Sequence, residues 1–400
     1  MPEARTTLTL PDDAQLFIVD DKGVVFRQGN QQLYSLNSFA TFIWCCLEEE
    51  ACLERAAGRA RETFGISDDV AQQWVDDAVE GWGAIGLIGD CVASAPVDPL
   101  SVTRLTCVDQ APAFSERDWQ CRLSYRLLDC RVDVMLQNAA WAEPVEAILG
   151  HLAVPGDAAA PGSGNIHVCL HDGWVVVYRN RLPVARFENV GSIAPTVKSI
   201  TLQEAVDNFD YAFSFHSGVL SNGDGLVMLS GAAGAGKSTL TAGLVNGGLC
   251  YYSDEVALVQ VKDYCVRPFP IALCSKEPAW PVLQPLFPTL ADMPAFERLD
   301  KKQVRYFPPP VLPQDPDYDR ALPIKVIVFP RYDNNANTEL LPIDRVAALH
   351  HLMEECLSIK HPLDIAAVGE MVEWIRGVEC YELPNNNLQQ AVDLVLGVMA

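Results

Sequence analysis

The chain has 400 residues, too many for one ordinary core, so we expect two to three domains of roughly 100 to 200 residues. Hydrophobic residues make up 49% and charged residues 20%, a globular composition that excludes a mainly disordered or fibrous chain. The 29 Lys and Arg against 52 Asp and Glu give a net charge of −23, which repels phosphate backbones and anionic lipids. Nucleic acid and membranes are therefore not expected partners.

The opening segment, MPEARTTLTLPDDA, lacks the apolar core of a secretory signal. No stretch reaches the roughly 18 continuous apolar residues that a membrane helix needs, so the sequence predicts a cytoplasmic protein. The 13 cysteines are odd in number, scattered, and never spaced as C-x-x-C, a pattern that predicts buried or free thiols rather than disulfides.

Residues 1–95 are predicted to form a small domain of three strands and three helices. Apolar runs at 16–19 and 24–26 flank a turn and predict a hairpin, and residues 33–36 predict a third strand. Helices are expected from Asn37 or Ser38 onward, over 53–64, and after Ser67. Residues 48–90 contain eleven acidic residues and three Arg, a net of −8. This acidic face is either solvated or binds something basic.

Residues 92–101, VASAPVDPLS, are predicted to be a linker, because two prolines and small residues do not continue a helix. Residues 96–200 predict a β-rich middle domain with strands near 131–136, 166–170 and 174–178 and a helix near 141–152. From residue 201 to 400 the order of helix, strand, glycine loop, helix and strand predicts a β-α-β unit and an α/β domain.

A phosphate-binding loop is the strongest motif. The apolar strand at 226–230 is followed directly by GAAGAGKST, which matches G-x-x-x-x-G-K-S in its required strand–loop–helix context. Glycines let backbone N–H groups turn toward the phosphates, and the next helix presents its positive N-terminus. The predicted ATP-binding residues in the loop are Gly231, Gly234, Ala235, Gly236, Lys237, Ser238 and Thr239. Lys237 is expected to reach the β- and γ-phosphates, and Ser238 to bind Mg²⁺.

Two acidic residues follow the next strand. Asp254 and Glu255 lie beside the apolar residues 256–259, one β-α-β step after Lys237. Phosphoryl transfer needs positioning, charge neutralisation, and a carboxylate that accepts the proton of the attacking hydroxyl. We expect Asp254 to be that base and also to lie at the metal, with Glu255 as the Mg²⁺ partner, although the two roles could be exchanged.

The order of His-x-Gly, strand, phosphate-binding loop and paired acids over about residues 201–345 resembles the catalytic domain of HPr kinase/phosphorylase and related serine kinases. The matching segments are HSGVL, GAAGAGKSTL and YSDEVALV. The resemblance implies that His216 is an active-site histidine, Asp254 the catalytic acid, and Lys276 a basic residue facing the phosphates. It also implies that Arg305 contacts ATP or substrate, and these kinases often form homo-oligomers. In two respects the chain departs from that family: Glu255 stands where Asp is usual, and the glycine-rich signature of HPr kinases does not follow the loop. HPr is therefore a poor candidate substrate, and the reverse phosphorylase activity is not expected.

Residues 10–90 resemble a PqqD-like domain, the winged-helix module that recognises leader peptides of ribosomally made, modified peptides. LYSLNSFATFIW and ETFGISDDVAQQWVDDAVEGWGAIGLI carry this resemblance. It implies that an extended peptide adds a strand to an exposed sheet edge. A domain that only packs on the kinase is the alternative.

The sequence thus predicts an ATP- and Mg²⁺-dependent kinase that phosphorylates a Ser or Thr hydroxyl of a peptide or protein held by the N-terminal domain, in peptide natural-product biosynthesis. Two alternatives remain: a kinase of a small-molecule hydroxyl, or a non-catalytic protein whose partner binding is gated by a nucleotide.

Overall fold

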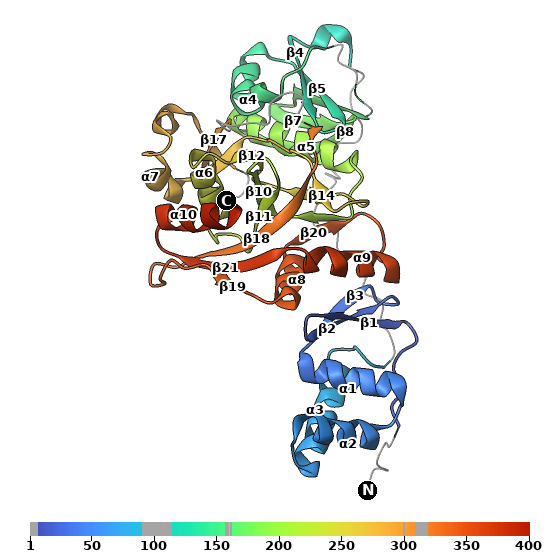
Figure 1. Cartoon of the computed structure of the whole chain (residues 1–400). Coiled ribbons are helices and arrows are strands. Elements are labelled where there is room, and N and C mark those ends of the chain that lie inside the picture. Colours follow the sequence, from blue (N-terminus) through green and yellow to red (C-terminus); the bar gives the residue numbers. More distant parts are fainter. Residues whose placement is uncertain (1–6, 90–113, 157–159, 161, 299–300, 309–318) are drawn as a thin grey trace. The chain divides into compact units, whose positions relative to one another are not determined.

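The computed structural model describes residues 7–89, 114–156, 160, 162–298, 301–308 and 319–400. The predicted linker at 92–101 and the predicted boundary at 95 lie outside these residues. The chain is a mixed α/β protein, as predicted, and it divides into two compact units (Figure 1). Unit 1 comprises Met1–Val97, Ile343–Glu354 and His361–Val378, and unit 2 comprises Asp98–Pro342, Glu355–Lys360 and Glu379–Ala400.

Unit 1 contains the predicted three strands and three helices. An antiparallel sheet runs in the order β1 (Ala14–Val19), β2 (Lys22–Arg27), β3 (Gln32–Leu36). Helices α1 (Ser38–Glu49), α2 (Leu53–Phe64) and α3 (Asp68–Ala84) follow, and the side chains of Asn37 and Ser67 cap α1 and α3. Val25, Ile43 and Trp44 are fully buried in their shared core. Helices α8 (Arg345–Glu354) and α9 (Ile365–Arg376) also belong to unit 1, although we predicted them in the C-terminal domain.

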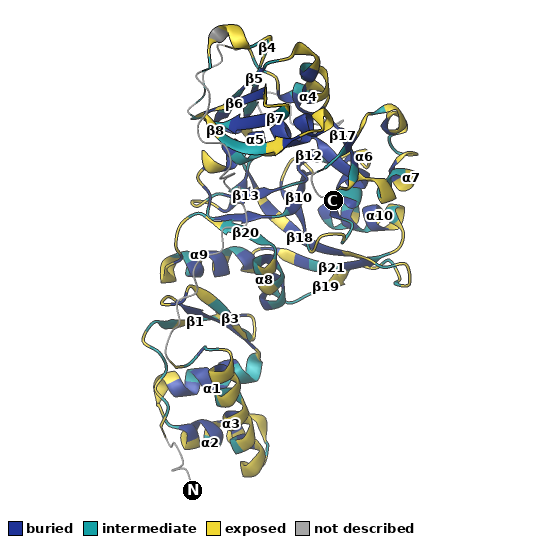
Figure 2. Ribbon diagram, turned by 180° about the vertical axis from the view of Figure 1, so that it is seen from behind, coloured by how far each residue is buried: buried dark blue, intermediate teal, exposed yellow. Residues whose placement is uncertain are grey.

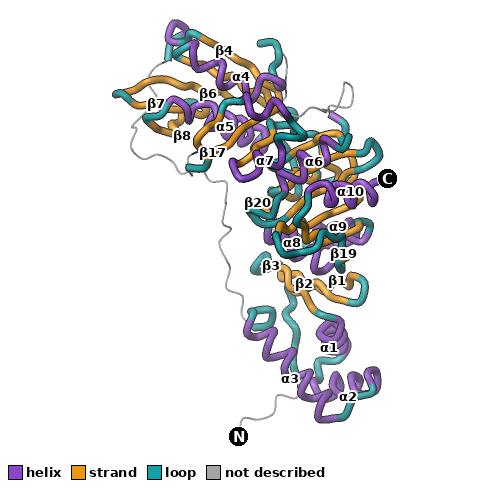
Figure 3. The backbone as a smooth tube through the Cα atoms, turned by 90° about the vertical axis from the view of Figure 1, so that its left-hand side faces the viewer, coloured by secondary structure: helices purple, strands orange, loops and turns teal. Residues whose placement is uncertain are grey.

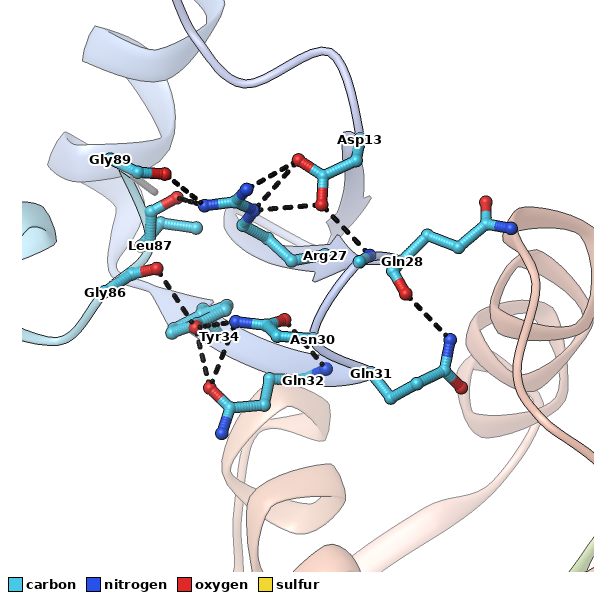
Figure 4. A network of polar contacts seen from close by, with 11 residues as sticks. Asp13, Arg27, Gln28, Asn30, Gln31, Gln32, Tyr34, Gly86, Leu87 and Gly89 are labelled. Carbon is cyan, nitrogen blue, oxygen red and sulfur yellow. Dashed lines mark hydrogen bonds and ion pairs between the residues drawn. The ribbon is translucent and has the colours of Figure 1, made fainter. Parts of the chain in front are cut away.

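A buried arginine holds the hairpin to the end of unit 1's helical part (Figure 4). Arg27 is 3% exposed; it forms an ion pair with Asp13 at 2.7 Å and donates to the carbonyls of Leu87 and Gly89. A second group links Tyr34 to Asn30 and, through its hydroxyl, to the carbonyl of Gly86. These bonds satisfy buried polar groups and hold β2 and β3 to the segment after α3.

Unit 2 is built on a ten-stranded sheet with the order β12-β10-β11-β18-β14-β13-β9-β20, and β21 pairs with both β18 and β19. Strands β11, β18 and β21 are parallel, as a β-α-β unit requires. All side chains of β11 and most of those of β18 are buried, whereas β21 has buried, intermediate and exposed positions (Figure 2). The strand bounds are β9 (Phe213–Phe215), β10 (Ser217–Ser221), β11 (Leu226–Ser230), β12 (Cys250–Ser253), β13 (Ala257–Val259), β14 (Cys265–Val266), β18 (Leu322–Tyr332), β19 (Leu341–Pro342), β20 (Cys356–Ile359) and β21 (Glu379–Asn385).

Helices α6 (Lys237–Asn246) and α10 (Leu388–Met399) lie side by side against the parallel strands (Figure 1). They share one core with β11 and β18, in which Leu229, Leu244 and Val395 are fully buried. The packing is close enough that a Cβ at Gly243 would lie 2.8 Å from Val392 of α10. Helix α6 is thereby fixed with its first turn at the end of β11.

The middle region forms a five-stranded sheet, β4 (Cys121–Leu127), β5 (Cys130–Leu136), β6 (Gly162–His171), β7 (Trp174–Arg179) and β8 (Leu182–Phe187), in that order. Helices α4 (Ala142–Leu149) and α5 (Ile193–Asp207) cover it (Figure 3). The predicted boundary at residue 200 falls inside α5. One continuous core joins this sheet to Ile271 and Val304 of the C-terminal part, so the region does not separate from the loop-bearing sheet.

A small sheet in the order β15-β17-β16 completes unit 2. Its strands are β15 (Leu273–Lys276), β16 (Ala295–Glu297) and β17 (Gln303–Phe307), and the short helix α7 (Trp280–Leu283) follows β15. Cys274 of β15 lies directly opposite Tyr306 of β17.

Among the described residues, no helix combines the length and the apolar character that crossing a membrane requires. The cysteines of the described residues form no disulfide with one another.

Candidate functional site

The glycine-rich loop lies between the end of β11 and the start of α6, where the motif predicts it. Gly231, Gly234 and Gly236 have φ angles of 146°, 93° and 94°, which L side chains rarely adopt. Gly236 is the residue before α6 and has a left-handed conformation. The loop is tied to the neighbouring parallel strand, because the N–H of Tyr332 donates to the carbonyl of Ala235 at 3.2 Å. The glycines are therefore required by the backbone path itself.

Lys237 lies over its own loop. Its ammonium donates to the carbonyl oxygens of Gly231 and Ala232, the latter at 3.2 Å, and the residue is 6% exposed. Burial lowers the pKa of Lys237, and the carboxylate of Glu355 opposes this effect. A buried ammonium that donates to neutral carbonyls is poised for a stronger, anionic acceptor such as phosphate.

Asp254 is a buried carboxylate next to the loop. It is 3% exposed, and its Oδ1 has no hydrogen-bond partner among the described residues. Burial, followed by the charge of Glu255, raises the pKa of Asp254 from 3.8 to about 7, and the hydroxyls of Ser238 and Thr241 oppose the rise. The first turn of α6 thus brings Ser238 beside this carboxylate.

Glu255 points elsewhere. Its carboxylate forms an ion pair with Lys198, a residue of α5 that is 4% exposed. Burial raises the pKa of Glu255, but the charge and hydrogen bond of Lys198 outweigh burial and hold the pKa below its usual value. The two adjacent carboxylates therefore lie in different environments: Asp254 adjoins the loop, whereas Glu255 adjoins helix α5.

His216 connects these surroundings. Its Nδ1 lies 2.9 Å from the carbonyl oxygen of Glu255, and its backbone N–H donates to the carbonyl of Glu355. Because a carbonyl oxygen only accepts, Nδ1 donates, and in the neutral ring Nε2 carries the lone pair. His216 also lines the cavity in front of the loop.

That cavity has a volume of about 370 Å³ and is bounded by the loop, β15, α7 and the ends of β18 and β21. Its wall includes Gly234, Gly236, Lys237, Ser238, Thr239 and Lys276, all predicted to bind ATP. The volume lies within the roughly 300–1,000 Å³ typical of small-molecule sites. We call it the loop cavity.

Five predicted site residues do not line the loop cavity: Gly231, Ala235, Asp254, Glu255 and Arg305. Gly231 and Ala235 contribute to the loop through their backbones: Gly231 has a positive φ angle, and the carbonyl of Ala235 accepts a hydrogen bond from the N–H of Tyr332. Arg305 is held elsewhere: its guanidinium lies 4.2 Å from the ring centroid of Trp280 and donates to the carbonyl of Leu290 at 2.9 Å. These contacts give Arg305 a packing role in the small sheet, and its contact with ATP stays a prediction.

Two residues near the site were not predicted. Lys198 is a lysine inside the apolar run of α5, and Glu355 follows α8 and lies near Lys237. A lysine surrounded by apolar residues in a helical pattern is a signal for a buried ion pair, but its partner is 57 residues away. No local pattern marks Glu355.

The residues present fit ATP and Mg²⁺. Mg²⁺ uses one or two carboxylates together with waters and substrate phosphates, and the hydroxyl of Ser238 and the unpartnered Oδ1 of Asp254 supply such oxygens. Glu255 is engaged by Lys198, and neither Glu255 nor Asp254 lines the loop cavity. Among the described residues, no group of three or more His, Cys, Asp or Glu forms a metal site made of protein ligands alone.

No family model matches the chain, and no curated protein matches it. A solved structure described as "TbiB1 in Complex with the TbiA(beta) Leader Peptide" is similar at 15% identity, covering 21% of this chain and 99% of that one, with a TM-score of 0.20. A likeness at this TM-score carries no conclusion about the present chain.

Proposed function

We propose that the protein is an ATP- and Mg²⁺-dependent kinase that phosphorylates a hydroxyl group. One observation carries the proposal: a glycine-rich loop with a buried Lys237 faces a cavity, and the buried Asp254 adjoins Ser238 of the same loop. This combination positions a triphosphate and supplies the charge that phosphoryl transfer requires. The resemblance to HPr kinase-related enzymes supports the same chemistry.

The proposed reaction follows from the placement of the groups. Loop amides and Lys237 hold the β- and γ-phosphates, and Ser238 with Asp254 would hold Mg²⁺, which supplies charge neutralisation when bound. The acceptor oxygen bonds to the γ-phosphorus, the bond from that phosphorus to the β–γ bridging oxygen breaks, and ADP leaves. The hydroxyl proton passes to a carboxylate.

The sequence does not decide whether Asp254 or Glu255 accepts the hydroxyl proton. The geometry favours Asp254 for both expected roles, because it adjoins Ser238 whereas Glu255 is held by Lys198 and faces away from the loop. Asp254→Asn should then abolish transfer, and Glu255→Gln should leave the Mg²⁺ dependence of ATP binding unchanged. If Glu255→Gln abolishes transfer and Asp254→Asn does not, Glu255 is the base.

The test of the function itself is direct. The full chain is incubated with ATP, Mg²⁺ and candidate acceptors, and mass spectrometry looks for a product heavier by one phosphoryl group. Lys237→Ala serves as the inactive control. ATP binding without transfer to any acceptor would favour the nucleotide-gated binding protein instead, and absence of ATP binding would reject both.

We further propose that unit 1 brings a peptide acceptor to the enzyme, in peptide natural-product biosynthesis. Within the described residues β3 pairs only with β2, so it offers an edge to an added strand. The exposed first turn of α3 carries Asp68 and Asp69, and Trp74 of the same helix is 39% exposed. These features suit a basic peptide with an apolar anchor. A titration should show a lysine-rich peptide binding at low salt and its glutamate-substituted counterpart not binding.

A small-molecule acceptor is the second candidate, because unit 2 contains another cavity beside Glu255. If the full chain phosphorylates a small hydroxyl compound and charge reversal at Asp68 and Asp69 leaves that rate unchanged, this candidate is favoured.

A further inference from the structure

The wall of the loop cavity has a charged part and an uncharged part. Lys237 and Lys276 lie at the loop and at the end of β15, where the triphosphate is expected. The uncharged part includes Tyr332, Asn385 and Asn386, at or just after the carboxyl ends of β18 and β21. Ligands of sheets with parallel strands bind beyond these ends. The neutral part of a nucleotide, its base, therefore belongs in the uncharged part.

Two exposed apolar side chains line this part of the cavity. Tyr332 is 54% exposed, and Val282 of α7 is 49% exposed. A neighbouring cavity of about 320 Å³ is lined by both Val282 and Asn386, so these two residues lie close together. Tyr332 is held in place, because its N–H donates to the carbonyl of Ala235 and its hydroxyl donates to Asn334 at 2.7 Å. A planar base can stack on the Tyr332 ring beside the loop.

Hydrogen bonds fix the orientation of the two amide side chains. Nδ2 of Asn385 donates to the carbonyl of Leu383 at 3.0 Å, which leaves Oδ1 as an acceptor. The hydroxyl oxygen of Thr338 accepts from the N–H groups of Asn386 and Asn387, so its own proton goes to Oδ1 of Asn386 at 3.0 Å. Nδ2 of Asn386 is left as a donor. Within the described part of the chain, neither Oδ1 of Asn385 nor Nδ2 of Asn386 has a hydrogen-bond partner.

This pair of groups matches adenine better than guanine. Adenine presents an amino donor beside the N7 acceptor, whereas guanine presents two acceptors, O6 and N7, on the same edge. The acceptor of Asn385 and the donor of Asn386 complement the adenine pattern. With guanine, Oδ1 of Asn385 would face O6, and two acceptors form no hydrogen bond.

We propose that Asn385 and Asn386 recognise the amino group and N7 of adenine and select ATP over GTP, with the base stacked on Tyr332 and covered by Val282. This inference rests on the proposed kinase function and adds to it the residues that choose the nucleotide.

Matched nucleotides test the proposal by isothermal titration calorimetry on the full chain with Mg²⁺. GTP should bind about tenfold more weakly than ATP or worse, because it leaves the acceptor of Asn385 unpaired. Purine riboside triphosphate lacks the amino group and 7-deaza-ATP lacks N7, and each should bind about fivefold more weakly than ATP.

Variants assign the roles. Asn385→Ala and Asn386→Ala should each weaken ATP binding about fivefold and change GTP binding less than about twofold, so the unchanged GTP affinity reports an intact loop. Tyr332→Ala should weaken both nucleotides about tenfold without changing their ratio, and Tyr332→Phe should retain both affinities. Gln389→Ala is the matched control, because this exposed amide lines the neighbouring cavity and not the loop cavity.

The proposal is overturned if the wild-type chain binds GTP as tightly as ATP, or if neither asparagine variant narrows the ratio of the two affinities. Failure of the kinase function is a separate result: selective ATP binding without phosphoryl transfer supports the base site and rejects only the kinase. A wild-type chain that binds no nucleotide overturns both.

Discussion

The loop cavity differs in construction from a second cavity of unit 2, which is lined by Lys198, Glu255 and Tyr306 among others and which we call the α5 cavity. The loop cavity is built around nine consecutive residues whose backbone holds the site. The α5 cavity is built from side chains on β8 and α5 and on the small sheet, which follows much later in the chain. A site formed by the backbone can be recognised in the sequence by glycines at fixed spacing, whereas a site formed by side chains from separate elements has no such sequence pattern.

The largest expected effect is on the loop side. The folded-state pKa of Asp254 is raised from 3.8 to about 7, so the native carboxyl binds a proton that the unfolded one has lost. Its contribution to stability is present below pH 3.8 and is lost as the pH rises to 7. At about 1.4 kcal/mol for each pKa unit, Asp254→Asn should stabilise the Mg²⁺-free protein by on the order of 4 kcal/mol at pH 8.

Urea unfolding of the wild type and Asp254→Asn at pH 5.5 and pH 8 measures this difference, which should be smaller at pH 5.5. Mg²⁺ should reduce it by stabilising the wild type alone. Equal stabilisation at both pH values would show that the pKa of Asp254 is not the cause.

On the α5 side, Lys198→Met removes one partner of a buried ion pair and leaves Glu255 uncompensated. Such losses cost about 3–5 kcal/mol, so we expect the free energy of unfolding to fall by roughly 3 kcal/mol because Glu255 keeps some solvent contact. Lys198→Met/Glu255→Gln should recover most of this loss. Denaturant unfolding of both variants measures these free energies. If the double variant is no more stable than Lys198→Met, Lys198 acts through packing alone.

Lys237→Ala should weaken ATP binding about 100-fold, because a buried, charge-assisted contact to phosphate is lost. Lys276 is an exposed residue of the same cavity, and Lys276→Ala should weaken ATP binding only a few-fold. Isothermal titration calorimetry compares them. Similar losses in the two variants would mean that the loop lysine does not reach the phosphates.

The smallest expected effect is that of Arg305→Ala, and it distinguishes a packing role of Arg305 from contact with ATP. Arg305→Ala should lower the free energy of unfolding by about 1–2 kcal/mol, because the cation–π contact to Trp280 and the bond to Leu290 are lost. ATP affinity should stay within about twofold. A drop in ATP affinity with unchanged stability would instead support the role predicted from the sequence resemblance.

Much of the local structure was predictable. The hairpin β1–β2, the caps of α1 and α3, and the strand–loop–helix around Gly231 all follow from local residue preferences, and the structure confirms them. The extent of the middle region was not predictable, since α5 crosses residue 200 and its apolar side packs against residues beyond 250. Burial by distant strands decides where such a region ends.

The sequence alone is sufficient to predict the glycine-rich loop, because its glycines and Lys237 act through backbone angles and spacing that lie within one short segment. Only the tertiary structure decided how the neighbouring acids divide. Asp254 adjoins Ser238 of helix α6, whereas Glu255 pairs with Lys198 of helix α5, 57 residues away in the chain. Charge pairing across that distance depends on which elements meet, and no local pattern contains that information.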